Sequence, residues 1–288
     1  MNTARAAYQD VRRSLKAAGI PEPDAKARVI VSEALGVGLG DVLLPLPMSA
    51  AQRAVIDAMA RRCAAGEPVE YVTGRAYFRY LTLAVTPDVL IPRQETELVA
   101  EEAIALIKAR GYGTALDIGT GSGCIAISLA TETGARVDAC DISEAALALA
   151  QKNARASGVS VRFFLSDMLS SVTEAYDIIV SNPPYISDEE YRTLDAGVRD
   201  HEPRLALAAG VRDHEPRLAL AAGDGLDYYR IIARDAGRHI KPGGALVLEI
   251  GATQAADLTA LLADAGFTEI TVKKDYAGRD RIVTARWK

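Results

Sequence analysis

The chain has few of the residues that build metal sites or disulfide frameworks. Its 288 residues include three cysteines, three histidines and one tryptophan. Cys63, Cys124 and Cys140 lie far apart and form no C-x-x-C pair, which favours reduced thiols packed in the interior of a cytosolic protein. Because the histidines have no metal-ligand spacing either, we predict no bound metal.

Long apolar runs and an excess of positive charge are also absent. No run approaches the length of a membrane span, and residues 1–19 lack the apolar centre of a signal peptide. The formal net charge is -5 with both signs interspersed, which argues against a surface built to bind duplex nucleic acid. We therefore expect a cytoplasmic protein that does not bind a membrane.

The first 66 residues have the apolar spacing of three short helices. Ala7, Val11 and Leu15 recur at helical intervals, and Ser49 is a candidate N-cap for the third helix. The segment contains no candidate catalytic residue. It predicts a small all-α domain over residues 1–66.

Residues 67–92 change from helical to extended spacing. β-branched and aromatic residues alternate with polar ones, and Gly74 and Pro87 interrupt them, which predicts a β-hairpin connector between domains. The next segment, residues 94–111, predicts a helix that ends at Gly111. The remainder of the chain, residues 93–288, then forms the second domain.

Strands and helices alternate from about residue 113 onward. Alternation of this kind predicts right-handed βαβ units and a mostly parallel, doubly wound sheet. The last two expected strands are joined by a short turn, so at least one of them should run antiparallel. The expected strands cover residues 114–118, 136–141, 160–165, 176–181, 244–250, 268–274 and 280–287.

A perfect tandem repeat interrupts this pattern. Residues 198–210 and residues 211–223 both have the sequence VRDHEPRLALAAG. Two identical copies are not a solenoid signature, which needs several diverged repeats. We predict that one copy is surplus to the fold and that the first copy, which keeps its spacing from the preceding motif, is the native-like one.

A glycine-rich turn follows the first strand of the predicted sheet. Gly119, Gly121 and Gly123 come directly after a buried strand that includes Asp117, and they open a helix. A dinucleotide-binding turn has the spacing G-x-G-x-x-G. Here the third glycine comes one residue early and Cys124 occupies its expected place, which is the spacing seen where S-adenosylmethionine binds. The alternative is a tight structural turn between strand and helix.

Acidic residues follow the next two strands. Asp141 ends the second strand, where a carboxylate can accept both ribose hydroxyls, although it could instead cap the helix that begins after Ser143. Asp167 and Met168 follow the third strand, where the adenine edge should lie. Asp167 could accept from the exocyclic amine and Met168 could pack on the ring; the alternative is an ordinary loop.

The strongest motif is Asn182-Pro183-Pro184-Tyr185, directly after strand 176–181. The lone pair of an amide or aryl NH2 group is delocalised, so the group is a poor nucleophile and must be oriented. The Asn182 side-chain oxygen and the Pro183 carbonyl can each accept one N–H, which aims the nitrogen at a methyl donor without a strong base. The prolines stiffen the loop, and Tyr185 offers a flat face to a planar substrate.

With these motifs, the chain resembles the HemK-type peptide chain release factor N5-glutamine methyltransferases almost from end to end. Besides the glycine-rich turn and the Asn-Pro-Pro-Tyr motif, the likeness includes the segment Ile91-Pro92-Arg93-Gln94-Glu95-Thr96-Glu97, the pair Glu202-Pro203 and the closing DYAGRDRIVTARW. The family usually has proline where Gln94 stands, a mild departure at a helix start. The tandem repeat has no counterpart in the family pattern.

The resemblance implies a class I, Rossmann-like methyltransferase fold that acts on the glutamine of the Gly-Gly-Gln loop of release factors. It implies that the N-terminal helices help to dock the release factor, and that Asn182, Pro183, Pro184 and Tyr185 hold the glutamine. The residues expected to bind S-adenosyl-L-methionine are Asp117, Gly119, Thr120, Gly121, Ser122, Gly123, Asp141, Asp167, Met168 and Asn182. We expect a monomer.

Three alternatives compete with this interpretation. An adenine-N6 or guanine-N2 nucleic-acid methyltransferase would use the same motif, but it should show a basic face or an added RNA-binding module. A non-catalytic binding protein of the same fold should have lost Asn182 or the loop glycines, and all are present. A nicotinamide dehydrogenase is excluded mainly by the glycine spacing.

Overall fold

A computed structural model describes residues 2–186, 201–207 and 224–288. Among these, residues 2–75 form one compact unit, and a second unit is built from residues 76–186, 202–207 and 224–288. The second copy of the tandem repeat lies outside the described residues. The domain boundaries predicted at residues 66 and 92 stay a proposal.

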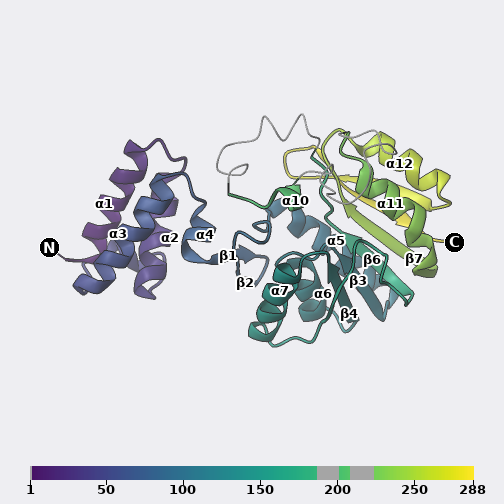
Figure 1. The fold of residues 1–288 in the computed structure, drawn as a ribbon, viewed down its shortest axis with the longest axis horizontal. Helices are drawn as coiled ribbons and strands as arrows, with labels where there is room; N and C mark the ends of the chain where they lie inside the picture. The colour runs from purple at the N-terminus through teal and green to yellow at the C-terminus, as the bar shows by residue number, and fades with distance from the viewer. Residues whose placement is uncertain (1, 187–200, 208–223) are drawn as a thin grey trace. The chain divides into compact units, whose positions relative to one another are not determined.

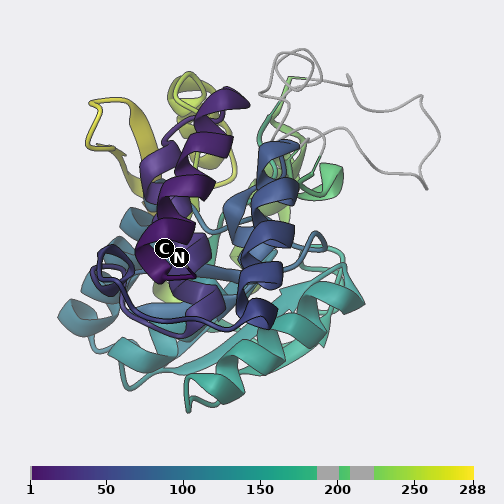
Figure 2. The same cartoon turned by 90° about the vertical axis from the view of Figure 1, so that its left-hand side faces the viewer.

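The N-terminal unit is helical, as its apolar spacing predicts (Figures 1 and 2). The side chains of Ala7, Val11 and Leu15 are buried in its core. Ser49 caps the third long helix: its hydroxyl accepts from the backbone N–H of Gln52, whose side chain accepts from the Ser49 N–H, so the predicted N-cap is part of a capping box. The helices are α1 (Ala4–Ala17), α2 (Pro23–Leu35), the 3-10 turn η1 (Asp41–Leu43), α3 (Ala50–Ala64) and α4 (Val69–Thr73).

Helix α4 lies where the sequence predicts extended structure. It begins after Pro68 and ends at Gly74, which adopts a left-handed conformation with φ of 72°. Val69 and Val72 face the same side of this single turn and enter the core of the N-terminal unit. Burial of these two side chains outweighs the β preference of valine.

The predicted hairpin and the helix after it are both present. Strands β1 (Arg75–Phe78) and β2 (Leu81–Ala84) form a two-stranded sheet. Helix α5 (Gln94–Arg110) then ends at Gly111, whose φ of 68° makes it the expected left-handed C-cap.

A seven-stranded sheet forms the centre of the second unit, in the order β5-β4-β3-β6-β7-β9-β8. The five strands from β3 to β7 are parallel, β9 is antiparallel to β7, and β8 is antiparallel to β9. The predicted antiparallel end of the sheet is therefore confirmed. The strands are β3 (Thr114–Ile118), β4 (Arg136–Asp141), β5 (Arg162–Leu165), β6 (Tyr176–Ser181), β7 (Ile240–Glu249), β8 (Thr268–Lys274) and β9 (Asp280–Arg286).

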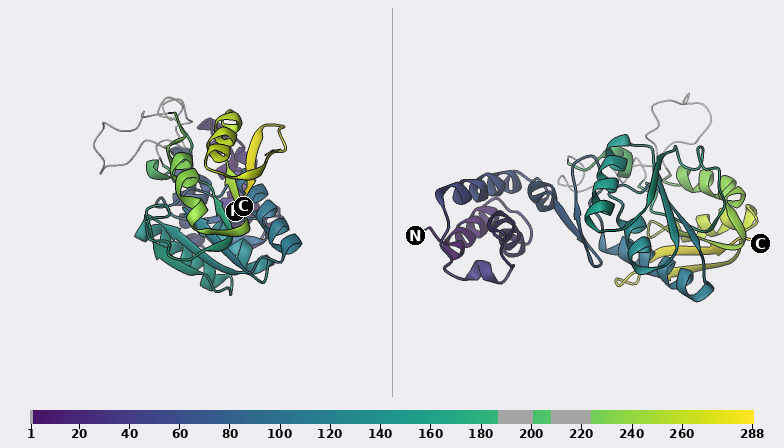
Figure 3. Two further views of the ribbon diagram at one scale, coloured as in Figure 1. Left: turned by 90° about the vertical axis from the view of Figure 1, so that its right-hand side faces the viewer. Right: turned by 90° about the horizontal axis from the view of Figure 1, so that it is seen from below.

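Helices cover both faces of this sheet (Figures 1 and 3). Helices α5, α6 (Cys124–Glu132) and α7 (Glu144–Ala156) pack on one core that includes Ala115, while α11 (Asp227–Asp235) and α12 (Ala255–Asp264) pack on the other, which includes Leu116. Alternate residues of the central strands enter the two cores, so apolar residues predominate on both faces of these strands. The single turns α10 (Arg204–Leu207) and η2 (Ala236–Arg238) complete the unit.

The register of the central strands brings the motifs to one edge of the sheet. Ile118 at the end of β3 pairs with Cys140 of β4 on one side and with Ser181 of β6 on the other. The residues that follow these three are Gly119, Asp141 and Asn182. Because the strand order reverses at β3, this edge is the switch point where doubly wound sheets bind ligands.

Within the described residues, none of the helices combines the length and apolar character needed to cross a membrane.

Candidate active site

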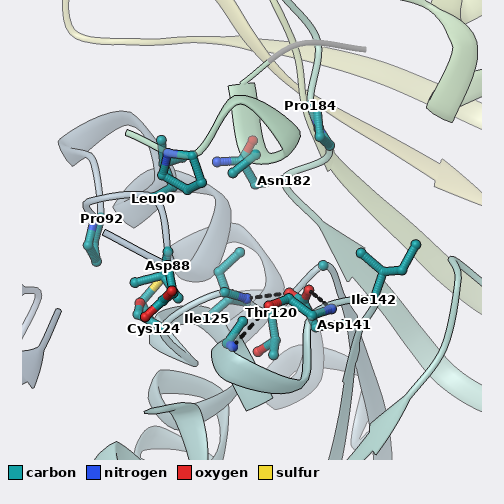
Figure 4. Close-up of a pocket in the computed structure, with 18 of the residues that line it drawn as sticks. Asp88, Leu90, Pro92, Thr120, Cys124, Ile125, Asp141, Ile142, Asn182 and Pro184 are labelled. Carbon is teal, nitrogen blue, oxygen red and sulfur yellow. Dashed lines mark hydrogen bonds between the residues drawn. The ribbon is translucent and has the colours of Figure 1, made fainter. Parts of the chain in front are cut away.

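A cavity of about 330 Å³ opens at this edge of the sheet (Figure 4). Figure 4 shows Asn182 near Leu90 at one end of the cavity and Asp141 near Thr120 at the other. The predicted site residues that line it are Gly119, Thr120, Gly121, Ser122, Asp141, Asp167, Met168, Asn182 and Pro184. Asp117, Gly123, Pro183 and Tyr185 are not among the lining residues.

The glycine-rich turn presents main chain to the cavity. Gly119 and Gly121 have φ values of 69° and 53°, and no atom lies within 4 Å of the place a Cβ would take at either position. These glycines are therefore required by their left-handed backbone, and the open space beside them is available to a ligand. The Gly119 and Thr120 N–H groups both donate to the Cys140 carbonyl, at 2.9 and 3.0 Å, which ties the turn to β4.

Asp117 braces this turn from below the cavity. Its Oδ2 accepts from the Thr120 hydroxyl at 2.7 Å and from the Ala126 backbone N–H at 3.2 Å. Burial is the largest influence on this carboxyl and raises its pKa to about 7. The other oxygen, Oδ1, is buried without a hydrogen-bond partner among the described residues. A buried acceptor of this kind is available to a further donor.

Asp141 lies on the cavity wall opposite Asn182. Its two carboxylate oxygens accept from the backbone N–H groups of Gly121 at 2.9 Å and Ser143 at 3.0 Å. Burial raises the pKa of this carboxyl. The N-cap of α7 is Ser143, whose hydroxyl accepts from the Ala146 N–H at 3.2 Å. Asp141 therefore orients the glycine-rich turn and is still placed to accept from a ligand.

The loop after β5 brings Asp167 and Met168 to the cavity. Met168 has a φ of 49°, unusual for a residue with a long side chain. Its carbonyl accepts from the Ser166 hydroxyl at 2.8 Å and from the Cys140 thiol at 3.5 Å. These contacts hold the backbone in a strained conformation at a residue that lines the cavity.

The Asn-Pro-Pro-Tyr motif begins where β6 ends. The Ser181 hydroxyl donates to the Ile118 carbonyl at 2.8 Å and fastens the start of the motif to β3. Asn182 donates from Nδ2 to the Thr96 hydroxyl at 3.0 Å, so its Oδ1 is left for another donor. Pro184 lines the cavity, whereas Pro183 is buried.

Tyr185 is held away from the cavity wall. Its ring packs against the core shared with α11 and α12, and its hydroxyl donates to Glu249 Oε1 at 3.1 Å. Burial raises the pKa of this phenol. The contact of its face with a planar substrate stays a prediction.

The cavity also has walls that the motifs do not indicate. The segment before α5 contributes Asp88, Leu90 and Pro92, and α5 itself contributes Thr96. The one signal for these residues in the sequence is their place in or next to the Ile-Pro-Arg segment, which carries part of the family resemblance but predicts no site role for its residues. Tyr228 of α11 contributes another wall and carries no signal in the sequence.

Part of the first repeat copy closes another side. Pro203 and Ala206 line the cavity, and the Ile186 N–H donates to the Leu207 carbonyl at 3.2 Å. The Glu202 side chain is 1% exposed and forms an ion pair with Arg93, just before α5. The described part of this copy is therefore packed into the fold at the site.

This fold and this arrangement of loops define a class I methyltransferase. The family model of the methyltransferase small domain matches residues 98–201, and that of the PrmC N-terminal domain matches residues 6–74. A methyltransferase from Pyrococcus furiosus has the same fold, with a TM-score of 0.51 and 18% identity over 72% of this chain and 88% of that one.

Two curated relatives identify the family more narrowly. The release factor glutamine methyltransferase of Cereibacter sphaeroides is 43% identical over 94% of each chain. The protein of the same name from Agrobacterium fabrum is 37% identical over 96% of this chain and 94% of its own. The chain belongs to the release factor glutamine methyltransferase family.

Proposed function

We propose that this protein transfers a methyl group from S-adenosyl-L-methionine to the side-chain amide nitrogen of the glutamine in the Gly-Gly-Gln loop of peptide chain release factors. One observation carries the proposal. In a chain of this family, Asn182 opens onto the same cavity as the glycine-rich turn and Asp141. A methyl donor and a planar amide can therefore meet in one enclosed space.

The residues of the turn fit S-adenosyl-L-methionine. The open space beside Gly119 and Gly121 suits close approach of a ligand to the main chain, and Asp141 is placed to accept from ribose hydroxyls. Beneath the turn, Asp117 Oδ1 has no hydrogen-bond partner in the part of the chain that the structure describes, so it is an acceptor left for a further donor. When bound, the cofactor supplies a methyl group on a positively charged sulfur, which makes that carbon electrophilic.

The Asn-Pro-Pro-Tyr turn holds and orients the glutamine. Asn182 Oδ1 accepts one N–H of the substrate amide. The motif offers the Pro183 carbonyl for the other N–H, although Pro183 is buried beside the cavity and does not line it. With both hydrogens bound, the nitrogen lone pair is directed into the cavity, so orientation and fixed dipoles replace a strong base. With the cofactor bound, this orientation would let the nitrogen take the methyl group as the carbon–sulfur bond breaks, and the extra proton would then leave to solvent.

A protein substrate suits the charges of the N-terminal unit better than a nucleic acid. Six of its eight arginines form ion pairs with acids: Arg12 and Arg28 with Asp24, Arg13 with Asp10, Arg53 with Asp10 and Asp57, Arg62 with Glu67, and Arg75 with Glu33. Phosphate binding needs a cluster of uncompensated cations. We propose that this unit docks the release factor, and that the enzyme acts in the cytoplasm as a monomer without a nucleic-acid substrate.

Mass spectrometry tests the proposed reaction. Purified release factor is incubated with the full-length protein and S-adenosylmethionine, digested and sequenced as peptides. We expect one added methyl group on the glutamine of the Gly-Gly-Gln peptide. A methyl group on another residue, or on ribosomal RNA or DNA supplied in parallel, would overturn the proposal.

A further inference from the structure

A chain of buried hydrogen bonds continues from Asn182 into the protein. Asn182 Nδ2 donates to Thr96 Oγ1 at 3.0 Å, and the Thr96 hydroxyl donates to Glu249 Oε2 at 2.6 Å. Thr96 and Glu249 are both buried, with 3% and 1% of their surface exposed. They come from α5 and from the end of β7, which are remote from Asn182 in the sequence.

The direction of these hydrogen bonds is decided at Glu249. Its Oε1 accepts from the Tyr185 hydroxyl at 3.1 Å, so each carboxylate oxygen faces a hydroxyl donor. An ionised carboxylate can only accept. The Thr96 hydroxyl has one hydrogen, and that hydrogen is committed to Glu249. Thr96 can therefore only accept from Asn182.

An asparagine side chain cannot choose its own orientation. The oxygen and the NH2 group of its amide are nearly alike in size, so a flip by 180° costs little unless a neighbour distinguishes the two ends. Thr96, as an obligatory acceptor, selects the NH2 end. The oxygen of Asn182 is then the atom left for the cavity.

We infer that Thr96 and Glu249 are positioning residues that fix which end of the Asn182 amide faces the substrate. The inference rests on the proposed function, because the free oxygen matters only if Asn182 accepts a hydrogen bond from the substrate amide. A flipped Asn182 would present an NH2 group to the NH2 group of the glutamine, and two donors repel each other.

The charge state of Glu249 makes this arrangement sensitive to pH. Burial raises the pKa of Glu249 to about 7, while Arg281 of β9 and the hydroxyls of Thr96 and Tyr185 lower it and Glu95 of α5 raises it. Below this pKa the protonated carboxyl can donate to Thr96, which frees the Thr96 hydrogen to point at Asn182. The productive orientation therefore belongs to the ionised form and is lost as the pH falls.

Nuclear magnetic resonance can test the orientation without any turnover. The chain has only three asparagines, Asn2, Asn153 and Asn182, so labelling with 15N-asparagine yields three side-chain NH2 pairs. Asn153 is a built-in control, because its Nδ2 donates to the carbonyls of Ala84 and Ser122. In the full-length protein we expect the Asn182 pair to shift as the pH is lowered through about 7, while the Asn153 pair stays unchanged.

Four substitutions complete the test. In Thr96→Val and in Glu249→Gln we expect the Asn182 pair to lose its pH response. Turnover on release factor should fall about 10- to 100-fold, the range found when the partners that orient a metal ligand are removed. Thr96→Ser keeps the hydroxyl and should recover most of the turnover. Thr259→Val, a matched change at a half-buried threonine of α12 that does not line the cavity, should behave as the wild type.

The outcomes separate this inference from the proposed function. If release factor is methylated normally by a folded Thr96→Val protein, the positioning role is overturned, and the same holds if the Asn182 signals are unchanged in that variant. If the wild type fails to methylate release factor while its Asn182 signals depend on Thr96 and pH, the orientation stands and the proposed substrate fails. Asp117 also has a pKa of about 7, so a pH dependence that survives in Glu249→Gln is assigned to Asp117 and counts against Glu249.

Discussion

At the scale of single residues, Asn182 is the residue proposed to contact both the methyl donor and the substrate amide. It directly follows β6, one of three strands that stop together at the switch point, and its side chain is fixed on the NH2 side by Thr96. Its oxygen is thus a preorganised acceptor, and no reorganisation is needed when the substrate binds. Preorganised groups of this kind stabilise mainly the transition state of the reaction.

Replacing Asn182 should therefore separate binding from turnover. In Asn182→Ala we expect methyl transfer to fall by about 100-fold or more, by analogy with the removal of one oxyanion-hole donor. Cofactor affinity should change much less, because the glycine-rich turn and Asp141 are untouched. Single-turnover kinetics together with calorimetry on S-adenosylhomocysteine would measure both. Near-normal turnover in this variant would show that another group orients the amide.

Replacing Asp141 should instead weaken cofactor binding. In Asp141→Ala the charge-assisted hydrogen bonds to ribose are lost, each worth roughly 1.5–3 kcal/mol, and so is the support of the Gly121 N–H. We expect cofactor affinity to fall by a factor of at least about 10. Calorimetry with S-adenosylhomocysteine is the measurement, and Asp257→Ala on the exposed side of α12 is the control. Unchanged affinity would remove Asp141 from the cofactor site.

The sequence motifs reveal part of the cavity lining but not the pair Thr96 and Glu249, which holds Asn182. Glycine spacing, the acid after β4 and the Asn-Pro-Pro-Tyr motif are each local patterns, because each is a short loop that needs particular residue types. Glu249 belongs to no such motif, and the segment around Thr96 indicates the family without giving this threonine a role. They meet across 153 residues of chain, and a threonine in a helix or a glutamate at the end of a strand is ordinary until tertiary structure buries it.

At the scale of elements, the central strands can be predicted from their local sequence, whereas helix α4 cannot. Both faces of β3, β4 and β6 are largely buried, so apolar residues predominate in these strands, turns bound them, and their predicted ends agree with the structure. Helix α4 is five residues long, and its local sequence is rich in valine and tyrosine. Packing into the N-terminal core, which no local window contains, decides its conformation.

The segment after the Asn-Pro-Pro-Tyr loop offers a test at this scale. Glu202 in the first repeat copy pairs with Arg93, and its counterpart in the second copy is Glu215. In Glu202→Gln a buried carboxylate is replaced by a neutral group of the same shape, which loosens the wall formed by Pro203 and Ala206. We expect affinity for S-adenosylhomocysteine to fall about 10-fold, a loss of about 1.4 kcal/mol.

The matched variant Glu215→Gln makes the same change in an identical local sequence. We expect no change in affinity, because the ion pair at the site is made by the first copy. Calorimetry on the two variants side by side would assign the copies. The reverse result, a loss with Glu215→Gln alone, would place the second copy at the site and contradict the arrangement described.

At the scale of the whole molecule, the duplication raises the question of whether the fold tolerates an inserted repeat copy. Residues 198–210 and 211–223 are adjacent and identical, so deleting either copy produces the same polypeptide. The deletion therefore tests whether one copy is sufficient for folding and activity. Only the point substitutions test which copy contributes to the site. One copy preserves both the spacing from Asn182 to the first Glu-Pro and the spacing from the last LALAA to Asp224.

We expect the chain that lacks residues 211–223 to fold and to methylate release factor at least as well as the full chain. The segment between Ile186 and Asp224 becomes shorter by less than half, and a doubling of loop length changes closure entropy by only about 0.6 kcal/mol. The midpoint of thermal unfolding should therefore stay within about 2–4 °C of that of the full chain, or rise. Calorimetric melting and the peptide assay on release factor would measure both. A deletion protein that is unfolded, or folded but inactive, would mean that the thirteen added residues have become part of the structure, because every contact of a single copy would still be available to it.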